Sequence, residues 1–481
     1  RRRRCAVETL ARVCKHDGVQ NRCFVAMPTN CPSVRIQLIS PVEQKRRHFK
    51  KILKKIPVPR KAEFLNFYSP EGILLDQGIA VFFAAPHSFT GEDVLELQGH
   101  GGDIVLDQIL QAVVASGARL AEPGEFSKRA FLNNKIDLAQ AEAIADLIAA
   151  QSVQAAQAAL NSLTGEFSFT VQEIVDELIN LRVYIEAAID FPEEEIDFLS
   201  DGIILKRIKI LIESIEKLQK QAKQGSVLRE GLTVVITGAP NAGKSSLLNA
   251  LAGNDIAIVT DIPGTTRDLL KEKILIEGVP LNIIDTAGLR ESNDVVEQEG
   301  IRRAQAAVSK AQGILLMIDI SHPASHLWEK EISSILALSG HQIPIVVLAN
   351  KIDLLSLDQQ KASLNHLKQL CVLQNLSEVN FLLVSAKTKK GLEDLQKILA
   401  KWAGVDHNVE TSFLARRRHL EAIALAEKFI LAAQNQLLNY KAGELVAEEL
   451  RQAQLALEEI TGKFTADDLL GNIFSSFCIG K

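Results

Sequence analysis

One short segment constrains the fold more than any other. Residues 238–245 read GAPNAGKS and match the pattern G-x-x-x-x-G-K-[ST]; an apolar run (Leu232–Thr237) precedes them and a helical stretch (Ser246–Leu251) follows. In such a strand–loop–helix, glycines let backbone N–H groups turn inward onto phosphate oxygens, and the helix N-terminus adds positive potential. A chance glycine-rich turn would not need the strand and the helix. We therefore expect Lys244 to reach the β- and γ-phosphates of a nucleotide and Ser245 to bind Mg²⁺.

The surroundings of this loop indicate an α/β domain at residues 231–404. Near-continuous runs of Val, Ile and Leu alternate there with helical stretches, which is typical of strands buried on both faces of a mostly parallel sheet. The runs are Leu232–Thr237, Leu281–Ile284, Gly313–Ile320, Ile343–Ala349 and Phe381–Ser385.

Helical periodicity brackets the α/β segment on both sides. Apolar residues recur three or four positions apart in Leu138–Ile148, in Ile174–Ala188 and again in Leu420–Leu437. This spacing predicts amphipathic helices, and Gly165 is predicted to separate the first two. The simplest architecture is an α/β module inserted into a helical domain, whose two parts are residues 135–230 and residues 405–481.

The N-terminal part of the chain has a different texture. Residues 36–134 show short mixed segments, with strands predicted at Ile79–Phe83 and Val94–Leu97, and are interpreted as a small α/β domain. Residues 1–35 show no periodicity and are predicted to be a poorly ordered basic segment. Its cysteines are too irregularly spaced for a zinc site; they are Cys5, Cys14, Cys23 and Cys31. We interpret His100 as a structural hydrogen-bonding residue and Cys371 as a small buried apolar residue.

Charge is distributed unevenly along the 481 residues. Residues 1–61 carry 17 Lys and Arg against 3 Asp and Glu, whereas the remainder carries 37 against 56. A nucleic acid would therefore have to bind through a local patch or a partner. The basic stretch Lys45–Lys61 could contact anionic lipid or be a solvated helix face. We find neither a signal peptide nor the ~18-residue apolar run that spans a bilayer, and expect a soluble, cytoplasmic protein.

Four further motifs follow the phosphate loop in the order expected of a GTPase. They are Gly264–Asp268 (GTTRD), Asp285–Gly288 (DTAG), Asn350–Asp353 (NKID) and Ser385–Lys387 (SAK). Any one could be a surface loop, but five motifs in order at workable spacing are not accidental. We expect Thr266 to be the second Mg²⁺ ligand, Asp285 to hold the ion through water, and Gly288 to sense the γ-phosphate.

The third of these motifs selects the base. The Asp353 carboxylate can accept hydrogen bonds from N1 and N2 of guanine, and the backbone of Ser385–Lys387 would cap the ring. Adenine lacks those donors, and a site built to make such bonds rejects the unpaired analogue by ~10⁴-fold or more.

One position departs from the common GTPase pattern. Many GTPases have Gln directly after the DTAG-type motif to orient the attacking water, but this chain has Leu289. A nearby carboxylate could take that role, and the alternative is a solvated acidic loop. The candidates are Glu291, Asp294, Glu297 and Glu299.

From about Ile52 to Lys481 the chain resembles the MnmE (TrmE) family of tRNA-modification GTPases. The resemblance rests on the strings SFTGEDVLELQGHGG, PGEFSKRAFLNNKIDLAQAEAIADLI, AAIDFPEEEIDF, PNAGKSSLLN, VTDIPGTTRD, DTAGLRE and FCIGK. Several lie outside the GTPase module, which argues against GTPases that share only the module. The resemblance does not extend to residues 1–35, and the family's N-terminal folate-contacting arginine matches no residue here.

The resemblance implies a multidomain fold of mixed α+β and α/β class. It would comprise an N-terminal α/β folate-binding domain, a central helical bundle, and an inserted P-loop GTPase domain with a mostly parallel sheet. The protein would be a homodimer through its N-terminal domains. Its GTPase domains would meet when GTP binds, with K⁺ in the active site.

The resemblance, taken with the motifs, also implies site residues. K⁺ would be bound by Asn241, Thr260, Ile262 and Thr265, and a formyl- or methylene-tetrahydrofolate by Glu96, Lys135 and Lys481. Glu297 would orient the attacking water, Lys244 would act on the phosphates, and Cys478 would serve the tRNA reaction. The GTP-binding residues would be Asn241, Ala242, Gly243, Lys244, Ser245, Ser246, Thr260, Asp261, Ile262, Pro263, Gly264, Thr265, Thr266, Asp285, Thr286, Ala287, Gly288, Asn350, Lys351, Ile352, Asp353, Ser385, Ala386 and Lys387.

The activity implied is modification of C5 of the wobble uridine in certain tRNAs, to an aminomethyl or carboxymethylaminomethyl form, together with an MnmG-type FAD protein. A ribosome-assembly GTPase is the main alternative. That class usually adds an RNA-binding module, and we find neither a basic Gly-x-x-Gly clamp nor an aromatic-basic strand pair. A regulatory or membrane-linked switch is the third reading.

Overall fold

The computed structural model describes most of the chain in two compact units. The described residues are 23–26, 35–40, 45–190, 202–251, 271–276, 278–285, 311–321, 328–330, 332–333, 343–373, 379–403 and 413–463. The described residues up to Ala145 belong to one unit, and Asp146–Lys463 is the other. None of the described helices combines the length and apolar character that crossing a bilayer requires.

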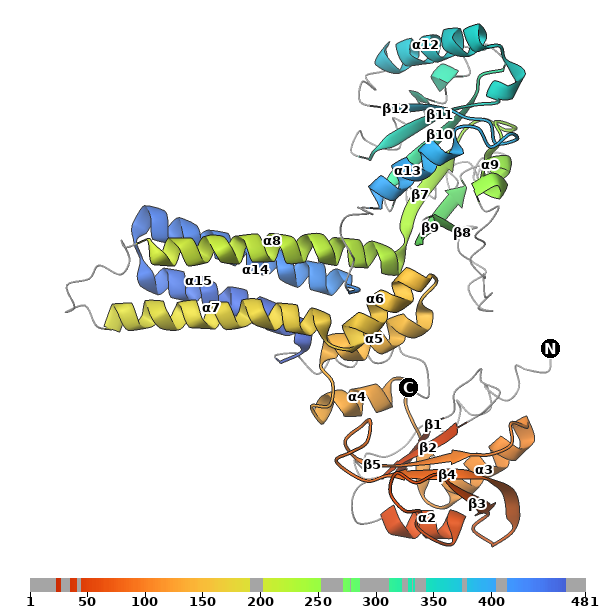
Figure 1. Cartoon of the computed structure of the whole chain (residues 1–481), viewed down its shortest axis with the longest axis vertical. Helices are drawn as coiled ribbons and strands as arrows, with labels where there is room; N and C mark the ends of the chain where they lie inside the picture. Colours follow the sequence, from red (N-terminus) through yellow and green to blue (C-terminus); the bar gives the residue numbers. More distant parts are fainter. Residues whose placement is uncertain are drawn as a thin grey trace, which may run out of the picture. The chain divides into compact units, whose positions relative to one another are not determined.

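The first unit contains a six-stranded sheet, sheet A, with strand order β3-β4-β5-β2-β1-β6 (Figure 1). Its strands are β1 (Cys23–Ala26), β2 (Arg35–Ser40), β3 (Glu63–Tyr68), β4 (Leu74–Phe83), β5 (Asp93–Gln98) and β6 (Ala118–Leu120). All neighbours are antiparallel except β1 and β6, which are parallel. Three helices accompany the sheet: α2 (Lys45–Leu53), α3 (Asp103–Ala115) and α4 (Glu125–Leu132).

The two faces of sheet A are covered unequally. Helices α2 and α3 pack on one face, where Phe82 of β4 and Leu95 of β5 meet Phe49 of α2 and Ile109 of α3. On the other face, which we call the open face, Phe64 and Ile79 are cross-strand neighbours and both are exposed. Helix α4 covers part of the open face, since its Phe126 packs with Val94 of β5.

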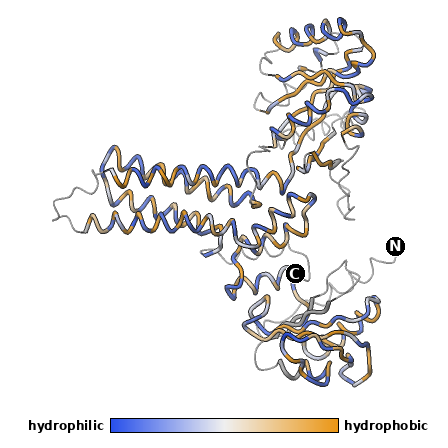
Figure 2. Tube along the Cα trace, in the orientation of Figure 1, coloured by the Kyte–Doolittle hydropathy of each residue, from blue (hydrophilic) through white to orange (hydrophobic). Residues whose placement is uncertain are grey.

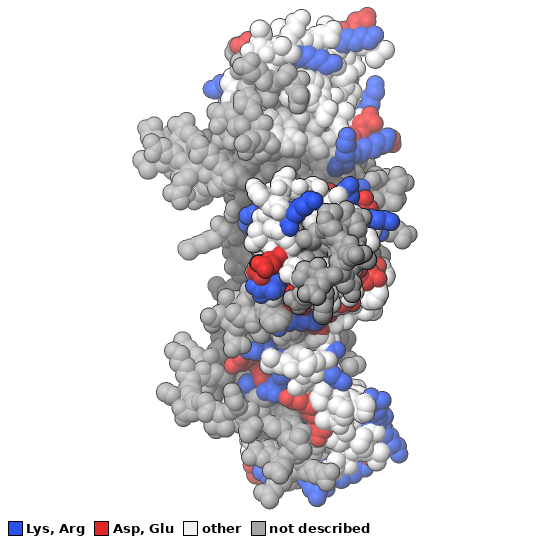
Figure 3. All heavy atoms as spheres, turned by 90° about the vertical axis from the view of Figure 1, so that its left-hand side faces the viewer, with Lys and Arg blue, Asp and Glu red and all other residues white. Residues whose placement is uncertain are grey.

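The predictions for this unit hold where the strands are long. β4 and β5 contain the two predicted strands, whereas β1 lies in the segment where we predicted none, because four residues are too few to show periodicity. Within the basic stretch, α2 buries Phe49 and Ile52 and exposes Lys50 and Lys51, so its described part is a solvated basic face over an apolar one. Blue side chains gather at the lower end of Figure 3, where Figure 1 draws α2.

The helical part of the second unit confirms the predicted architecture. Its bundle contains α7 (Glu166–Asp190) and α8 (Ile203–Glu230) from before the α/β module, and α14 (Arg417–Tyr440) and α15 (Gly443–Thr461) from after it. These four helices pack side by side (Figure 1). Their buried stripes include the predicted apolar positions, such as Leu178 of α7 and Ile430 of α14.

The chain breaks twice, not once, between the first two helical stripes. Gly165, with φ +96°, separates α6 (Val153–Leu163) from α7 as predicted. The other break lies between α5 (Leu138–Ala149) and α6, where the Ser152 side chain caps α6 by accepting a hydrogen bond from the Ala155 N–H at 3.1 Å. A serine before a helical run is the signal that would have predicted it.

The inserted module contains a second six-stranded sheet, sheet B, with strand order β12-β11-β10-β7-β9-β8. Its strands are β7 (Leu232–Thr237), β8 (Lys271–Ile276), β9 (Val279–Asp285), β10 (Gly313–Asp319), β11 (Ile345–Asn350) and β12 (Asn380–Leu383). All pairs are parallel except β8–β9. Each predicted apolar run overlaps one of these strands, which confirms the mostly parallel sheet.

Helices cover both faces of sheet B. One face packs on α9 (Lys244–Leu251) and α13 (Leu392–Trp402), and the other on α12 (Leu357–Leu373). The central strands are therefore buried throughout, and Figure 2 shows them as continuous hydrophobic tubes. Cys371 of α12 is fully buried as predicted, and burial raises the pKa of its thiol to about 11.

Candidate nucleotide-binding site

The predicted nucleotide-binding segments meet at one edge of sheet B. Because β7, β9, β10, β11 and β12 are parallel, their carboxyl ends lie at the same edge. The phosphate loop follows β7, Asn350 ends β11, and Ser385 lies just beyond β12. In open α/β sheets ligands bind outside the carboxyl ends of the strands, so this edge is the candidate site.

The phosphate loop has the backbone that its sequence predicts. Gly238 and Gly243 have φ of +147° and +103°, and Asn241 between them has φ +63°. A Cβ at Gly238 would overlap the carbonyl oxygen of Met317 on β10, and one at Gly243 would overlap the side chain of Asn350. Both glycines are therefore required by positive φ and by close approach.

Lys244 lies across this loop. Its residue is only 6% exposed, and its Nζ donates to the carbonyl oxygens of Gly238 at 2.8 Å and Ala239 at 3.0 Å. The ammonium is thus held beside the loop by neutral acceptors, which anionic oxygens can replace. Ser245 follows at the first turn of α9, where its exposed hydroxyl has the oxygen chemistry that Mg²⁺ prefers.

Asn350 ties the phosphate loop to the loop after β12. The residue is 2% exposed; its Nδ2 donates to the Ala242 carbonyl at 2.7 Å, and its Oδ1 accepts from the Ala386 N–H at 3.2 Å. An amide is suited to this position because it is donor and acceptor at once. Asn350 therefore joins three of the predicted motifs, which are its own, the phosphate loop and the Ser385–Lys387 segment.

Asp353 and Ser385 form a second link at the same end. The Ser385 hydroxyl donates to Asp353 Oδ1 at 2.7 Å and accepts from the Thr388 N–H at 3.1 Å. Ile352 begins a short 3₁₀ turn, and its carbonyl oxygen accepts a hydrogen bond from the side-chain amide of the buried Gln360 at 2.9 Å. The structure thus brings the NKID-type and SAK-type motifs together, as predicted.

Asp319, at the end of β10, is a neighbour that the sequence analysis missed. Lys351 donates to Asp319 Oδ2 at 2.6 Å, and the N–H and hydroxyl of Ser321 donate to Oδ1 at 2.9 and 2.6 Å. Partial burial raises the pKa of the Asp319 carboxyl, but the hydrogen bonds from Lys351 and Ser321 outweigh it and lower the pKa below its usual value. A charged residue at the end of an otherwise apolar run was the available signal.

Several predicted site residues lie outside the described residues. They are Thr260, Asp261, Ile262, Pro263, Gly264, Thr265, Thr266, Thr286, Ala287, Gly288, Glu297, Cys478 and Lys481. Asp285 is described only as the end of β9. Within the described ranges, no group of three His, Cys, Asp or Glu side chains could hold a metal ion.

In the first unit, Glu96 lies within β5 and Lys135 lies beside Gly91 of the β4–β5 loop. Glu96 of β5 lies opposite Val81 and is on the open face, since Gln98, two residues on, pairs with the exposed Ile79. Lys135 follows α4, and its side chain lies so close to Gly91 that a Cβ there would approach its Cγ to 3.3 Å. His100 and Asp76 share a hydrogen bond of 2.8 Å, so His100 is a hydrogen-bonding residue as predicted.

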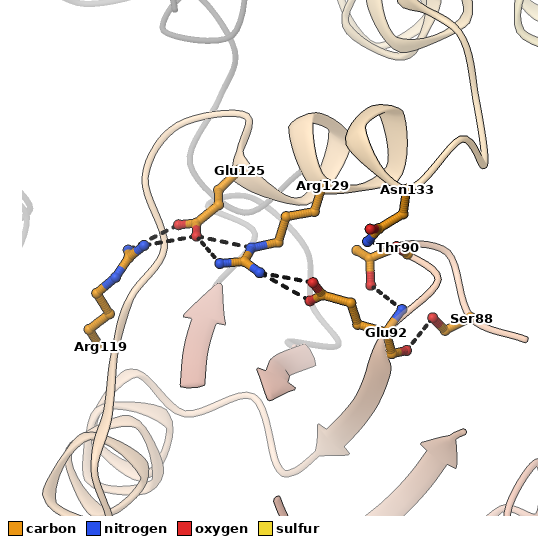
Figure 4. A network of polar contacts seen from close by, with 7 residues as sticks. All are labelled: Ser88, Thr90, Glu92, Arg119, Glu125, Arg129 and Asn133. Carbon is orange, nitrogen blue, oxygen red and sulfur yellow. Dashed lines mark hydrogen bonds and ion pairs between the residues drawn. The ribbon is translucent and has the colours of Figure 1, made fainter. Parts of the chain in front are cut away.

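An ion-pair network holds this loop against α4 (Figure 4). Arg129 of α4 donates to both Glu92 oxygens at 3.1 Å and to the buried Glu125 at 3.1 and 3.2 Å. Arg119 makes two further bonds to Glu125, at 2.9 and 3.0 Å. Asn133 donates to the Thr90 carbonyl at 2.7 Å. Two arginines and two glutamates thus order the surroundings of Gly91 and Lys135, which sequence spacing did not reveal.

Two family models together match nearly all of the chain after its first segment. Residues 32–135 match the N-terminus of the GTP-binding protein TrmE, and residues 138–478 match the MnmE helical domain.

Proteins called tRNA modification GTPase MnmE match over the same span. The one from Coxiella burnetii (strain Dugway 5J108-111) is 54% identical over 431 residues, 90% of this chain and 92% of that protein. The one from Hydrogenovibrio crunogenus is 55% identical over 430 residues, with 89% and 92% covered. The one from Pasteurella multocida is 55% identical over 431 residues, with 89% and 93% covered.

Solved structures match only in part. The G domain of the T. maritima FeoB iron transporter is 24% identical, with a TM-score of 0.26, and covers 36% of this chain and 98% of its own. Era from Aquifex aeolicus bound to GDP and AlF4⁻ is 26% identical, with a TM-score of 0.27, and covers 41% and 66%.

Proposed function

The chain belongs to the MnmE family of tRNA modification GTPases, and on this premise we propose that it couples potassium-dependent GTP hydrolysis to modification of C5 of the wobble uridine. The observation that carries the nucleotide part is the link of the phosphate loop to the base-recognition loops through Asn350. This arrangement supports a preformed site for a guanine nucleotide.

Guanine selection follows from Asp353. Its carboxylate is positioned by the Ser385 hydroxyl and has a second oxygen for the N1 and N2 donors of the base. Lys351 and Ile352 belong to the same turn, and the Ser385, Ala386 and Lys387 backbone caps the ring.

Phosphate binding uses Lys244 and the surrounding backbone. When GTP binds, its β- and γ-phosphate oxygens replace the Gly238 and Ala239 carbonyls as acceptors for Lys244. Ser245 and Thr266 are the proposed Mg²⁺ ligands, and Mg²⁺ neutralises charge on the phosphates.

The cation and the attacking water are assigned to the switch segment. Asn241, exposed and at φ +63°, would bind K⁺ with its side chain, and Thr260, Ile262 and Thr265 would complete the shell. K⁺ there supplies charge that an arginine finger supplies in other GTPases. Glu297 would orient the water that converts GTP to GDP and phosphate, because Leu289 cannot.

The first unit is the proposed folate-binding and dimerisation domain. Glu96 on the open face, Lys135 beside Gly91 and Lys481 would contact a formyl- or methylene-tetrahydrofolate, which supplies the one-carbon unit. The open face also exposes Phe64 and Ile79, and contiguous exposed apolar groups mark association surfaces. This supports a homodimer through sheet A.

The tRNA reaction needs partners. An MnmG-type FAD protein would join the dimer in a heterotetramer and Cys478 would serve the uridine chemistry, giving an aminomethyl or carboxymethylaminomethyl product. Because residues 62–481 are acidic in balance, the partner would supply most of the surface that holds tRNA. A tRNA substrate makes the cytoplasm the proposed place of action.

Exchange of K⁺ for Na⁺ tests the hydrolysis mechanism. GTP turnover of the purified chain should fall at least about tenfold in NaCl relative to KCl, since Na⁺ is a poor fit for a K⁺ shell. Equal turnover in the two salts would remove the roles given to Asn241 and the switch segment.

Mass spectrometry of tRNA nucleosides tests the reaction. A strain deleted for this gene should lose the modified wobble uridine, and the wild-type gene should restore it. Unchanged uridines with a ribosome-assembly defect would favour the alternative GTPase class.

A further inference from the structure

A buried carboxylate joins the two places where the chain passes between the bundle and the α/β module. Asp146 of α5 is 8% exposed, and its Oδ1 accepts from Arg229 Nε at 2.9 Å and from Arg416 Nη2 at 2.8 Å. Its Oδ2 accepts from Arg416 Nε at 3.2 Å. We call Asp146, Arg229 and Arg416 the Asp146 clasp.

The two arginines mark the entry to the module and the return from it. Arg229 is in the last turn of α8, and β7 begins three residues later at Leu232. Arg416 is the N-cap of α14, the first bundle helix after the module. One carboxylate therefore holds two segments that are 83 and 270 residues away in the sequence.

Neighbouring contacts hold the same two segments. The buried Ser162 hydroxyl of α6 accepts from the Leu414 N–H at 2.9 Å, and the Phe413 ring stacks on Phe167 of α7 at 4.5 Å. On the entry side, Asn282 of β9 donates to the Glu230 carbonyl at 2.8 Å. The return segment is thus attached to the bundle, and sheet B to the end of α8.

The clasp adds directional hydrogen bonds where the bundle meets the α/β module, a contact that is otherwise mainly apolar. Ala158, Ala159 and Leu228 pack with the core of sheet B, but apolar contacts are non-directional. Two covalent links alone would leave rotation about the line between them. A guanidinium donates in a planar fork, so its bonds to a buried carboxylate specify an angle. The clasp therefore fixes, relative to α5, the end of α8 from which the chain enters the module and the start of α14 to which it returns.

We infer that Asp146 is a positioning residue that transmits the state of the nucleotide site to the bundle, so that GTP turnover is converted into tRNA modification. The inference rests on the proposed function. The nucleotide loops lie at the carboxyl edge of sheet B, and among the described residues movement there can reach the bundle through the segments that join the two. Without the carboxylate the module keeps its own cores and site but turns more freely.

The experiment compares Asp146→Asn with the wild-type full chain. GTP turnover is measured on the purified protein, and modified wobble uridine per GTP hydrolysed is measured with the MnmG-type partner and tRNA. We expect turnover within about twofold of wild type and a yield per GTP lower by at least about fivefold, the low end of coupling between sites. Asp146→Glu should restore part of the yield.

The matched control is Glu448→Gln. Glu448 pairs with Arg451 at 2.8 Å within α15, so the same chemical change breaks an ion pair that joins no two elements. Neither turnover nor yield per GTP should change.

Three results would overturn the inference. The first is an unchanged yield per GTP in Asp146→Asn. The second is a loss of both yield and turnover that matches the loss of folded protein measured by circular dichroism. The third is an equal loss of yield per GTP in the Glu448→Gln control. If Asp146→Asn does not fold, the same ratio of modified uridine to GTP hydrolysed is measured in Arg416→Gln. This variant keeps the Asp146–Arg229 pair. A wild-type chain that hydrolyses GTP but never modifies uridine would refute the proposed function itself.

Discussion

Sheets A and B have the same number of strands but present different surfaces. Helices cover both faces of sheet B, whereas sheet A has helices α2 and α3 on one face and leaves Phe64 69% and Ile79 40% exposed on the other. A sheet closed on both faces can bind only at its edge, and a half-open sheet can bind through a face. The candidate residues follow this division: the described ones of sheet B lie at or just beyond the carboxyl ends of its strands, and Glu96 lies within a strand.

The largest expected effect tests whether GTP turnover belongs to the edge of sheet B alone. Lys244→Ala removes the ammonium that should stabilise charge on the phosphates, and losing one such donor costs about 10²–10³-fold in turnover. The matched change near sheet A, Lys51→Ala on the exposed face of α2, should leave turnover unchanged. A steady-state GTPase assay measures both, and comparable losses would contradict the division.

A pair of truncations tests the difference in burial. Leu316 of β10 is fully buried, so Leu316→Ala should lower the free energy of unfolding by about 2–5 kcal/mol. Phe64→Ala, on the open face, should change it by less than about 0.5 kcal/mol but weaken self-association of the chain. Urea unfolding and analytical ultracentrifugation provide the readouts. A large loss of stability in Phe64→Ala would mean that something covers the open face.

Two asparagines sharpen the contrast between edge and face. Asn350→Ala removes the two hydrogen bonds that join the nucleotide loops, and we expect GTP to bind about tenfold more weakly, about 1.4 kcal/mol. Asn66 of β3 also makes two side-chain bonds, to Tyr68 at 3.0 Å and from Gln77 at 2.8 Å, but lies in sheet A. Calorimetric GTP titration should show no change in Asn66→Ala; equal weakening would argue for a global effect.

The smallest expected effect is a change in how GDP binding depends on pH at acidic values. Since the pKa of Asp319 is lowered in the folded chain, its contribution to stability is present above the unfolded value, about 3.9, and is lost as pH falls through the folded value. Because ionised Asp319 also holds Lys351 at the proposed nucleotide site, Asp319→Asn should flatten the decline in GDP binding below about pH 4. Asp76 of β4 in sheet A is the control: burial raises its pKa, but hydrogen bonds from His100 outweigh this and lower it. Asp76→Asn should leave the pH profile of GDP binding unchanged.

The same contrast explains how much of the fold the sequence predicted. Strands buried on both faces are apolar throughout, so β10 (GILLMID) and β11 (IVVLAN) were evident. In sheet A, β3 (EFLNFY) mixes polar and apolar residues on a half-open sheet, and β1 has four residues. Neither pattern is distinct from a loop, and neither strand was predicted.

The candidate site was predictable where chemistry is local. The phosphate loop and the base-recognition motifs are contiguous in sequence, and the described ones lie together as expected. Asp319 with Lys351, the Arg129 network and the Asp146 clasp join residues far apart in the chain, up to 270 residues for Asp146 and Arg416. Such pairs depend on topology, and one sequence without the fold does not specify them.

Gly225 of α8 bears on how the α/β module could have been inserted into the helical domain. The returning segment crosses the helix there so closely that a Cβ would overlap the Phe413 carbonyl, and the outgoing strand leaves the same helix at Gly231. The entry to the inserted module and the return from it thus lie near the same end of α8, at Gly231 and Gly225. A domain inserted at such a site leaves the core of the receiving domain intact, so the helical bundle is a scaffold into which a different domain could be inserted.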